Sequence, residues 1–332
     1  ATYQVTGGAK AMAEELIATV EQITTDHPDK FEIAHNVADA ERIFIEGKIA
    51  LPMGMENGAP LEGDLSNIQH FRERGISYIT LTHSEDNDIC DSSYNLGERT
   101  HNGLSDFGAE VVKEMNRVGI MVDISHVSDE AFYQVMDVTQ VPAIASHSSA
   151  RHFTPGFERN MSDDMIKRLA ENGGVIQINF GSSFVTQESQ DKRRRNSEVV
   201  NQFMEDNNLT SDDLKVKDFA KQVAEENPVF CDVTDVADHF DHVVDLVGID
   251  HVAFGSDYDG VGDTLPYGLK DPSDFPNLIY HLLKRGYSEE DIKKISYKNV
   301  WRVWKATEDF ASELCSCGML KDDCSMESCS TS

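Results

Sequence analysis

Short apolar runs alternate with amphipathic segments through most of the chain. Between the runs, Phe107–Gly119 places apolar residues on one helical face, and Ser128 is positioned to cap a helix that extends to about Val138. Near-continuous apolar strands that alternate with helices predict a parallel sheet with the helices outside it. We interpret six of the apolar runs as strands, which end near Met55, Thr82, Ser125, Ser146, Phe180 and Phe254.

The first part of the chain follows a different pattern. Residues 1–47 are expected to be helical, so the run Lys48–Met55 is the first strand that we predict. Further amphipathic segments predict helices at these positions: Ala9–Thr25, Val37–Glu46, Ile68–Gly75, Ser162–Asn172 and Val236–Val247.

Polar residues follow several of the strands directly rather than gathering at one point of the sheet. This distribution is typical of barrel enzymes, whose chemistry lies at the carboxyl ends of the strands, and it disfavours a doubly wound open sheet. We therefore predict an α/β fold, a TIM-like (β/α)8 barrel. Such a barrel needs eight strands and the pattern indicates six, so we expect the first two strands to precede residue 1.

The expected barrel domain covers residues 1–310. Within it, residues 181–232 interrupt the alternation of strands and helices. They predict a helical excursion from the barrel, which is either a lid over the barrel or a solvated surface insertion. Residues 311–332 are small, polar and aperiodic, and we expect a flexible tail. Metal binding by its cysteines is disfavoured because their spacing matches no standard zinc site; they are Cys315, Cys317, Cys324 and Cys329.

Composition excludes some partners. The formal net charge is −30, and a surface this negative repels phosphate backbones, so nucleic acid is not an expected partner. No run of 18 apolar residues is present to span a membrane. The first residues do not resemble a signal peptide, so a signal, if the protein is exported, would lie upstream of residue 1.

Two histidines end neighbouring strands. His126 and His147 follow successive apolar runs, one strand–helix–strand unit apart, so their imidazoles can share one metal ion. Glu56 follows another strand among glycines and is either a metal ligand or a helix cap. Asp257 follows the last strand, where it either handles protons or forms a turn before a helix.

Several ordered segments resemble the membrane (renal) dipeptidases, the M19 metallopeptidases, from near residue 10 to about Phe310. The segments are Asp123–Ser128, Ser146–Arg151, Gly255–Gly260, Thr80–Ser84, the Gly-Met-Glu-Asn-Gly stretch around Glu56, and Arg159-Asn160. The resemblance implies a barrel hydrolase with two zinc ions that cleaves dipeptides through a hydroxide bridging the metals.

The resemblance also implies roles for single residues. Glu56 would bridge both metals, and His126 and His147 would ligate the second one. His83 would contact the substrate near its carbonyl, and Arg159 would bind the terminal carboxylate. Asp257 would bind the amino end of the substrate and take part in proton transfer. A substrate held at both ends must be short, which favours dipeptides over proteins; a homodimer is also expected to be possible.

One departure leaves alternatives open. The family carries a His-x-Asp pair on its first strand for the first metal, and we find no such pair at a strand end here. His27-Pro28-Asp29 is expected in a loop, and His239-Phe240-Asp241 on a helix. We therefore expect an N-terminally incomplete chain. The rival interpretations are another amidohydrolase-like barrel, such as a deaminase or lactonase, and a non-catalytic barrel that has lost its first metal site.

Overall fold

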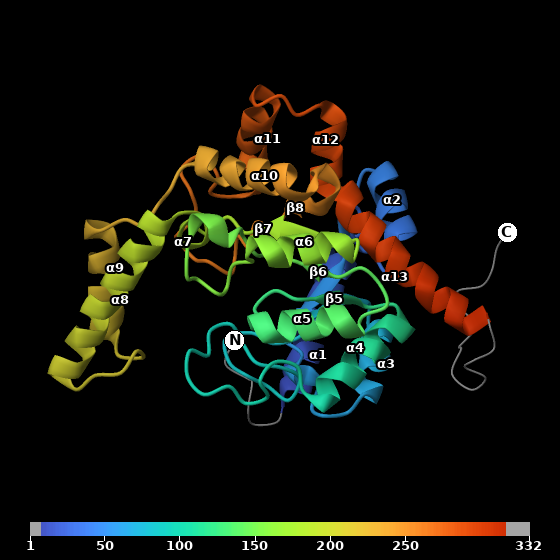
Figure 1. Ribbon diagram of the computed structural model, residues 1–332, viewed down its shortest axis with the longest axis horizontal. Helices are drawn as coiled ribbons and strands as arrows, with labels where there is room; N and C mark the ends of the chain where they lie inside the picture. The colour runs from blue at the N-terminus through green and yellow to red at the C-terminus, as the bar shows by residue number, and fades with distance from the viewer. Residues whose placement is uncertain (1–7, 317–332) are drawn as a thin grey trace. The chain divides into compact units, whose positions relative to one another are not determined.

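The computed structural model describes residues 8–316 of the 332-residue chain (Figure 1). These residues form two compact units. The first unit comprises 8–145, 168–175 and 298–316, and the second comprises Ser146–Lys167 and Ile176–Tyr297. Of the four tail cysteines, Cys317, Cys324 and Cys329 lie outside the described residues.

The first unit contains strands β1 to β6 and the helices that accompany them. Strands β3, β4, β5 and β6 pair in parallel and follow one another in chain order. The elements are α1 (Ala9–Asp26), β1 (Phe31–Ile33), α2 (Val37–Ile45), β2 (Ile49–Leu51), β3 (Met53–Glu56), η1 (Ala59–Leu61), α3 (Ser66–Glu73), β4 (Ile76–Thr80), α4 (Asp106–Val118), β5 (Met121–Asp123), α5 (Asp129–Val138), β6 (Ile144–Ala145) and α13 (Asn299–Ser316).

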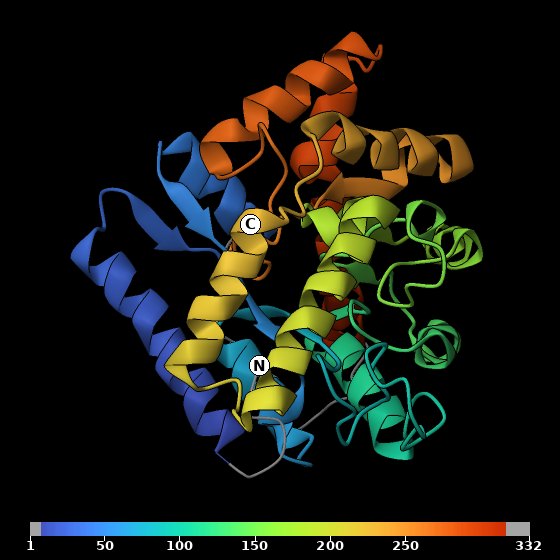
Figure 2. The same ribbon diagram turned by 90° about the vertical axis from the view of Figure 1, so that its left-hand side faces the viewer.

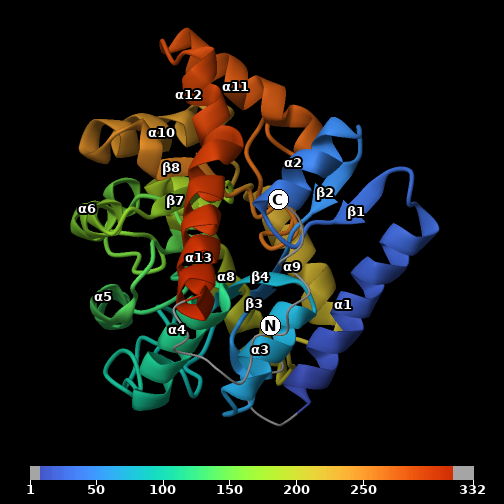
Figure 3. The same cartoon turned by 90° about the vertical axis from the view of Figure 1, so that its right-hand side faces the viewer.

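Helix ends in the first unit follow the local sequence. The Ser128 side chain accepts a hydrogen bond from the backbone N–H of Ala131 at 3.2 Å, which caps α5 as the sequence predicts. Gly119 ends α4 in the left-handed conformation, with φ 81°. The late helix α13 packs against α2 and α4 and buries Trp304 (Figure 3). Residues far apart in the sequence therefore share the core of this unit.

The second unit contains the parallel pair β7 and β8 with mostly helical surroundings. Its core includes the buried rings of Phe180 and Phe240, and the half-buried Phe254 packs against Phe240 with ring centroids 5.5 Å apart. Its elements are η2 (Arg151–Phe153), the start of α6 (Asp163–Glu171), most of β7 (Val175–Ile178), α7 (Ser182–Val185), α8 (Gln187–Asn207), α9 (Leu214–Glu226), α10 (Val233–Val247), η3 (Ile249–His251), β8 (Val252–Phe254), η4 (Pro272–Asp274), α11 (Phe275–Lys284), α12 (Glu289–Lys293) and the start of the π-turn η5 (Lys294–Lys298).

The excursion at residues 181–232 is helical, as predicted. Helices α8 and α9 lie side by side and are joined by a short connection (Figure 2). The rings of Phe203 and Phe219 stack between them with centroids 4.2 Å apart. Whether this helical pair covers a substrate stays a prediction.

Three predictions about the elements need correction. Residues 1–47 are not all helical, because Phe31–Ile33 forms β1, which pairs in parallel with β2. The predicted strand Lys48–Met55 is two strands, since Pro52 has no N–H to donate and separates β2 from β3. The last helix continues to Ser316, so residues 311–316 are helical rather than part of a tail. No described helix has the length and apolar character needed to cross a membrane.

Candidate metal centre

Glu56 ends β3 and is followed by a tightly fixed turn. Asn57 adopts the left-handed conformation, with φ 94°, and its side-chain oxygen accepts a hydrogen bond from the N–H of Ala59 at 3.0 Å. A Cβ atom at the next residue, Gly58, would lie 2.9 Å from the carbonyl oxygen of Leu81. Glycine is therefore required at position 58 for the close approach of the two backbones. The turn fixes the backbone from which the half-exposed Glu56 side chain projects.

His126 lies just beyond the end of β5 and is buried. Its backbone is left-handed, with φ 71°, which is unusual for a residue with a side chain. The buried carboxylate of Asp123 supports this turn: it accepts a hydrogen bond from Thr80 Oγ1 at 2.5 Å and another from the backbone N–H of Ser125 at 3.0 Å. Strain of this kind is typical of functional sites, where the surrounding contacts hold it in place.

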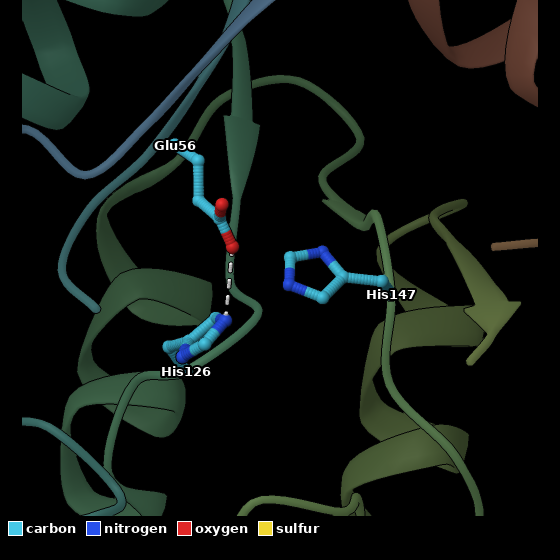
Figure 4. A group of neighbouring side chains, drawn as sticks. All are labelled: Glu56, His126 and His147. Carbon is cyan, nitrogen blue, oxygen red and sulfur yellow. Dashed lines mark ion pairs between the residues drawn. The ribbon is translucent and has the colours of Figure 1, made fainter. Parts of the chain in front are cut away.

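Glu56 faces two imidazoles within the first unit. Its Oε1 atom lies 3.2 Å from His126 Nε2 and 3.5 Å from His83 Nε2, and Figure 4 marks the first of these pairs. The rings of His83 and His126 stack with centroids 4.2 Å apart. Ser84 Oγ lies 2.5 Å from His83 Nδ1, which orients that ring. Residues that follow β4 and β5 thus place two imidazoles beside the carboxylate at the end of β3.

His147 lies just beyond β6, near the start of the second unit, beside a buried arginine. Arg159 donates hydrogen bonds from Nη2 to the His147 carbonyl oxygen and from Nη1 to Ser148 Oγ, both at 2.8 Å. Its guanidinium also lies over the ring of Phe184, 5.5 Å from the centroid. These contacts fix the orientation of the guanidinium, and Ser146 Oγ lies 2.7 Å from His147 Nδ1.

Asp257 follows β8 in another left-handed turn, with φ 62°. Its Oδ2 atom accepts a hydrogen bond from Asn179 Nδ2 at 2.8 Å. A Cβ atom at Gly260 would overlap the Asp257 carboxylate, so a larger residue at position 260 would displace that carboxylate. Asn179 was not among the residues predicted from the sequence. It directly follows strand β7, a strand-end position like those of the predicted site residues, and that position is the signal that could have identified it.

The residue types present fit a divalent metal ion. Glu56 and His126 in the first unit and His147 in the second are candidate ligand residues in the described part of the chain, and Figure 4 labels all three. One carboxylate and two imidazoles are donors that suit zinc. The two His-x-Asp segments of the sequence are not positioned as metal ligands. His27 caps the end of α1, and His239 is buried in α10 with both ring nitrogens engaged, Nδ1 by the N–H of Ala150 at 3.1 Å and Nε2 by the Val185 carbonyl at 2.9 Å.

Comparison with known proteins decides the family. The model of the membrane dipeptidase family, peptidase family M19, matches residues 4–316. The chain belongs to this family. The resemblance seen in the sequence is thereby confirmed.

Curated M19 relatives are dipeptidases by name. The chain is 34% identical over 296 residues to dipeptidase tcpJ of Claviceps purpurea, covering 89% of this chain and 60% of that protein. It is 35% identical over 270 residues to an uncharacterized dipeptidase of Schizosaccharomyces pombe, covering 81% of this chain and 55% of that protein. The chain thus spans little more than half the length of these two relatives.

Solved structures confirm the fold class. The probable dipeptidase PvdM from Pseudomonas aeruginosa is 27% identical and superposes with a TM-score of 0.80, over 93% of this chain and 83% of that one. A metallo peptidase from Rhodobacter sphaeroides is 23% identical, with a TM-score of 0.73 over 90% of this chain and 75% of that one. The fold is the TIM-like α/β barrel fold of M19 hydrolases, and β3 to β8 are the six strands that the sequence predicts.

Proposed function

We propose that the protein to which this chain belongs is a zinc-dependent dipeptidase. The observation that carries the proposal is the contact between Glu56 and His126, at 3.2 Å, within a chain of the M19 family. A carboxylate and an imidazole nitrogen this close, each at a strand end, are arranged as two ligands of one ion.

Glu56, His126 and His147 would hold the metal. When bound, zinc would polarise the scissile carbonyl and lower the pKa of a water molecule to about 7. The Asp123 carboxylate would act through His126, because its hydrogen bonds to Thr80 and Ser125 hold the turn in which the histidine lies. His83 lies 3.5 Å from the same Glu56 oxygen, and we assign it contact with the substrate near the carbonyl.

The two ends of the substrate would be held by different residues. Arg159 would bind the free carboxylate, since a guanidinium oriented by Ser148 and the His147 carbonyl matches a carboxylate with two parallel hydrogen bonds. Asp257, held by Asn179, would bind the amino end and transfer a proton there. Recognition of both termini restricts the substrate to a dipeptide.

Hydrolysis of a peptide panel tests the proposal. The protein, loaded with zinc, is incubated with dipeptides, with the matching tripeptides and with C-terminally amidated dipeptides, and free amino acids are measured. We expect release from free dipeptides alone, and loss of release after chelation or in Glu56→Gln. Absence of turnover for every dipeptide in the presence of zinc would contradict the proposal, and equal rates on amidated dipeptides would contradict the role of Arg159.

A further inference from the structure

A second group of candidate metal ligands lies within the second unit. It consists of His152 in η2, Asp163 in the first turn of α6, and His242 in α10. Each residue offers one ligand atom, and these atoms all lie within 4.8 Å of one another. The closest pair is His242 Nε2 and Asp163 Oδ1, at 2.8 Å. Three separate elements therefore direct nitrogen and oxygen donors to one place.

The spacing is close to what a metal ion needs. Zinc–ligand distances of about 2.0–2.2 Å in a tetrahedral arrangement place neighbouring ligand atoms roughly 3.3–3.6 Å apart. The separations here, from 2.8 Å to at most 4.8 Å, bracket that range. His152 is exposed and Asp163 and His242 are half-buried, which leaves an entry path and room for water as a further ligand.

The two imidazoles are already placed as a pair. The rings of His152 and His242 stack with centroids 4.4 Å apart and an angle of 23° between their planes. Within the described residues His152 makes ring contacts with Phe153 and His242 but no hydrogen bond, so its ring nitrogens are not committed elsewhere.

The contacts around this group limit which neighbouring residues can act as metal ligands. Phe153 packs against the buried His239 with ring centroids 4.3 Å apart and also contacts His242, 5.6 Å between centroids. His239 is excluded as a ligand because Ala150 and Val185 engage both of its nitrogens. The exposed His152 thus leaves the group accessible, and Phe153 packs against its His242 ring.

We propose that His152, Asp163 and His242 bind a divalent first-row transition-metal ion such as Zn²⁺, separately from the Glu56 centre. Two imidazoles and one carboxylate are donors that these ions accept, and Mg²⁺ and Ca²⁺ are disfavoured because they take oxygen ligands. The ion ties η2 and the start of α6 to α10. Arg159 lies in the segment between η2 and α6, so the ion braces the stretch of chain that carries it.

The test measures zinc binding rather than activity. Metal-free protein carrying Glu56→Gln and His126→Ala is dialysed against Zn²⁺ and analysed for bound metal, and Co²⁺ is added to a second sample to record its visible absorption spectrum. We expect one equivalent of zinc to remain and Co²⁺ to show the bands of nitrogen ligation. His152→Ala should weaken this binding by at least about 100-fold, because even the loss of outer-shell partners costs 10- to 100-fold.

Two further variants keep the outcome unambiguous. His281→Ala removes a histidine of the same unit that belongs to neither candidate group of the described residues, and it should bind zinc as before. Asp163→Asn should behave like His152→Ala, with an unchanged circular dichroism spectrum showing that the fold is intact. Zinc binding that is equal in the parent and in His152→Ala, or that falls equally in His281→Ala, would overturn the proposal. Failure of dipeptide hydrolysis would leave this measurement untouched, because it does not depend on turnover.

Discussion

His83 and His126 stack with ring centroids 4.2 Å apart, and their Nε2 atoms face the same carboxylate oxygen of Glu56. Two histidines that contact the same carboxylate can still have different functional roles. His126 is buried in a left-handed turn, whereas the His83 side chain is 20% exposed. We propose on this difference that His126 is a metal ligand and that His83 contacts the substrate.

The first prediction distinguishes these two roles. His126→Ala should both lower the zinc affinity of the Glu56 centre and abolish hydrolysis, because a metal ligand is lost. His83→Ala should leave zinc bound while kcat falls by roughly 100- to 1000-fold, the range for loss of one group that stabilises the transition state. Metal analysis beside steady-state kinetics provides the check. Equal metal loss in both variants would show that His83 is itself a ligand.

The second prediction concerns the carboxylate end of the substrate. Arg159→Lys should reduce kcat/KM for dipeptides by roughly 10- to 100-fold, because a hydrogen bond to a charged group contributes about 1.5–3 kcal/mol and lysine cannot form the two-pronged contact. The kinetics of Arg193→Lys serve as the control, since Arg193 donates to Ser183 in α7 instead. Unchanged kcat/KM in Arg159→Lys would exclude the proposed role.

The third prediction uses the turn that holds Asp257. An added methyl group in Gly260→Ala would overlap the Asp257 carboxylate and force it away from Asn179. Misplacement of a catalytic group by about 1 Å can cost about 100-fold in rate, so we expect a fall in kcat of that order. Asp259→Ala, one residue earlier, is the matched control, because the Asp259 side chain is exposed. Wild-type kcat in Gly260→Ala would show that the position of Asp257 is not critical.

The fourth prediction concerns pH. Burial lowers the pKa of His239 from 6.5 to about 4, so the folded protein holds this ring neutral while the unfolded chain protonates it. The unfolded state binds more protons between these values, and the contribution of His239 to stability is therefore complete above pH 6.5 and lost as pH falls toward 4. The loss is at most about 3 kcal/mol, at about 1.4 kcal/mol for each pH unit.

Urea unfolding monitored by circular dichroism at several pH values measures this loss. His239→Gln can keep an acceptor for the Ala150 N–H and a donor to the Val185 carbonyl, but it does not titrate. Its free energy of unfolding should decline less steeply than that of the wild type between pH 6.5 and 4. The same slope in both proteins would assign the pH dependence to other groups.

The strands were predictable where the apolar pattern was strong. Strands β3 to β8 are short but mostly apolar, and each is followed by polar residues, so their positions could be recognised from the sequence. Strand β1 is only Phe31–Ile33, with one charged residue among three, and such a segment is too short to show a period. Its strand conformation comes from pairing with β2, which is a tertiary contact.

The candidate site was predictable as a set of residues but not as a geometry. Strand-end positions identified Glu56, His126 and Asp257, whereas the left-handed backbones of His126 and Asp257 depend on the surrounding packing. The second ligand group was missed because His242 lies within an amphipathic helix and His152 beside an aromatic residue, positions at which sequence periodicity indicates packing. Only the fold brings the centroids of these two rings to within 4.4 Å of each other.

Helix α13 completes the first unit with residues that leave the ribosome after the entire second unit. Until they emerge, the faces of α2 and α4 that α13 covers stay exposed, and the N–H of Val37 lacks the Glu308 carboxylate that accepts its hydrogen bond. Helices α2 and α4 therefore lack this partner until α13 has been synthesised, with apolar surface available to chaperones in the meantime. Contacts this distant along the chain also slow folding, because closing the intervening loop costs entropy before any contact forms.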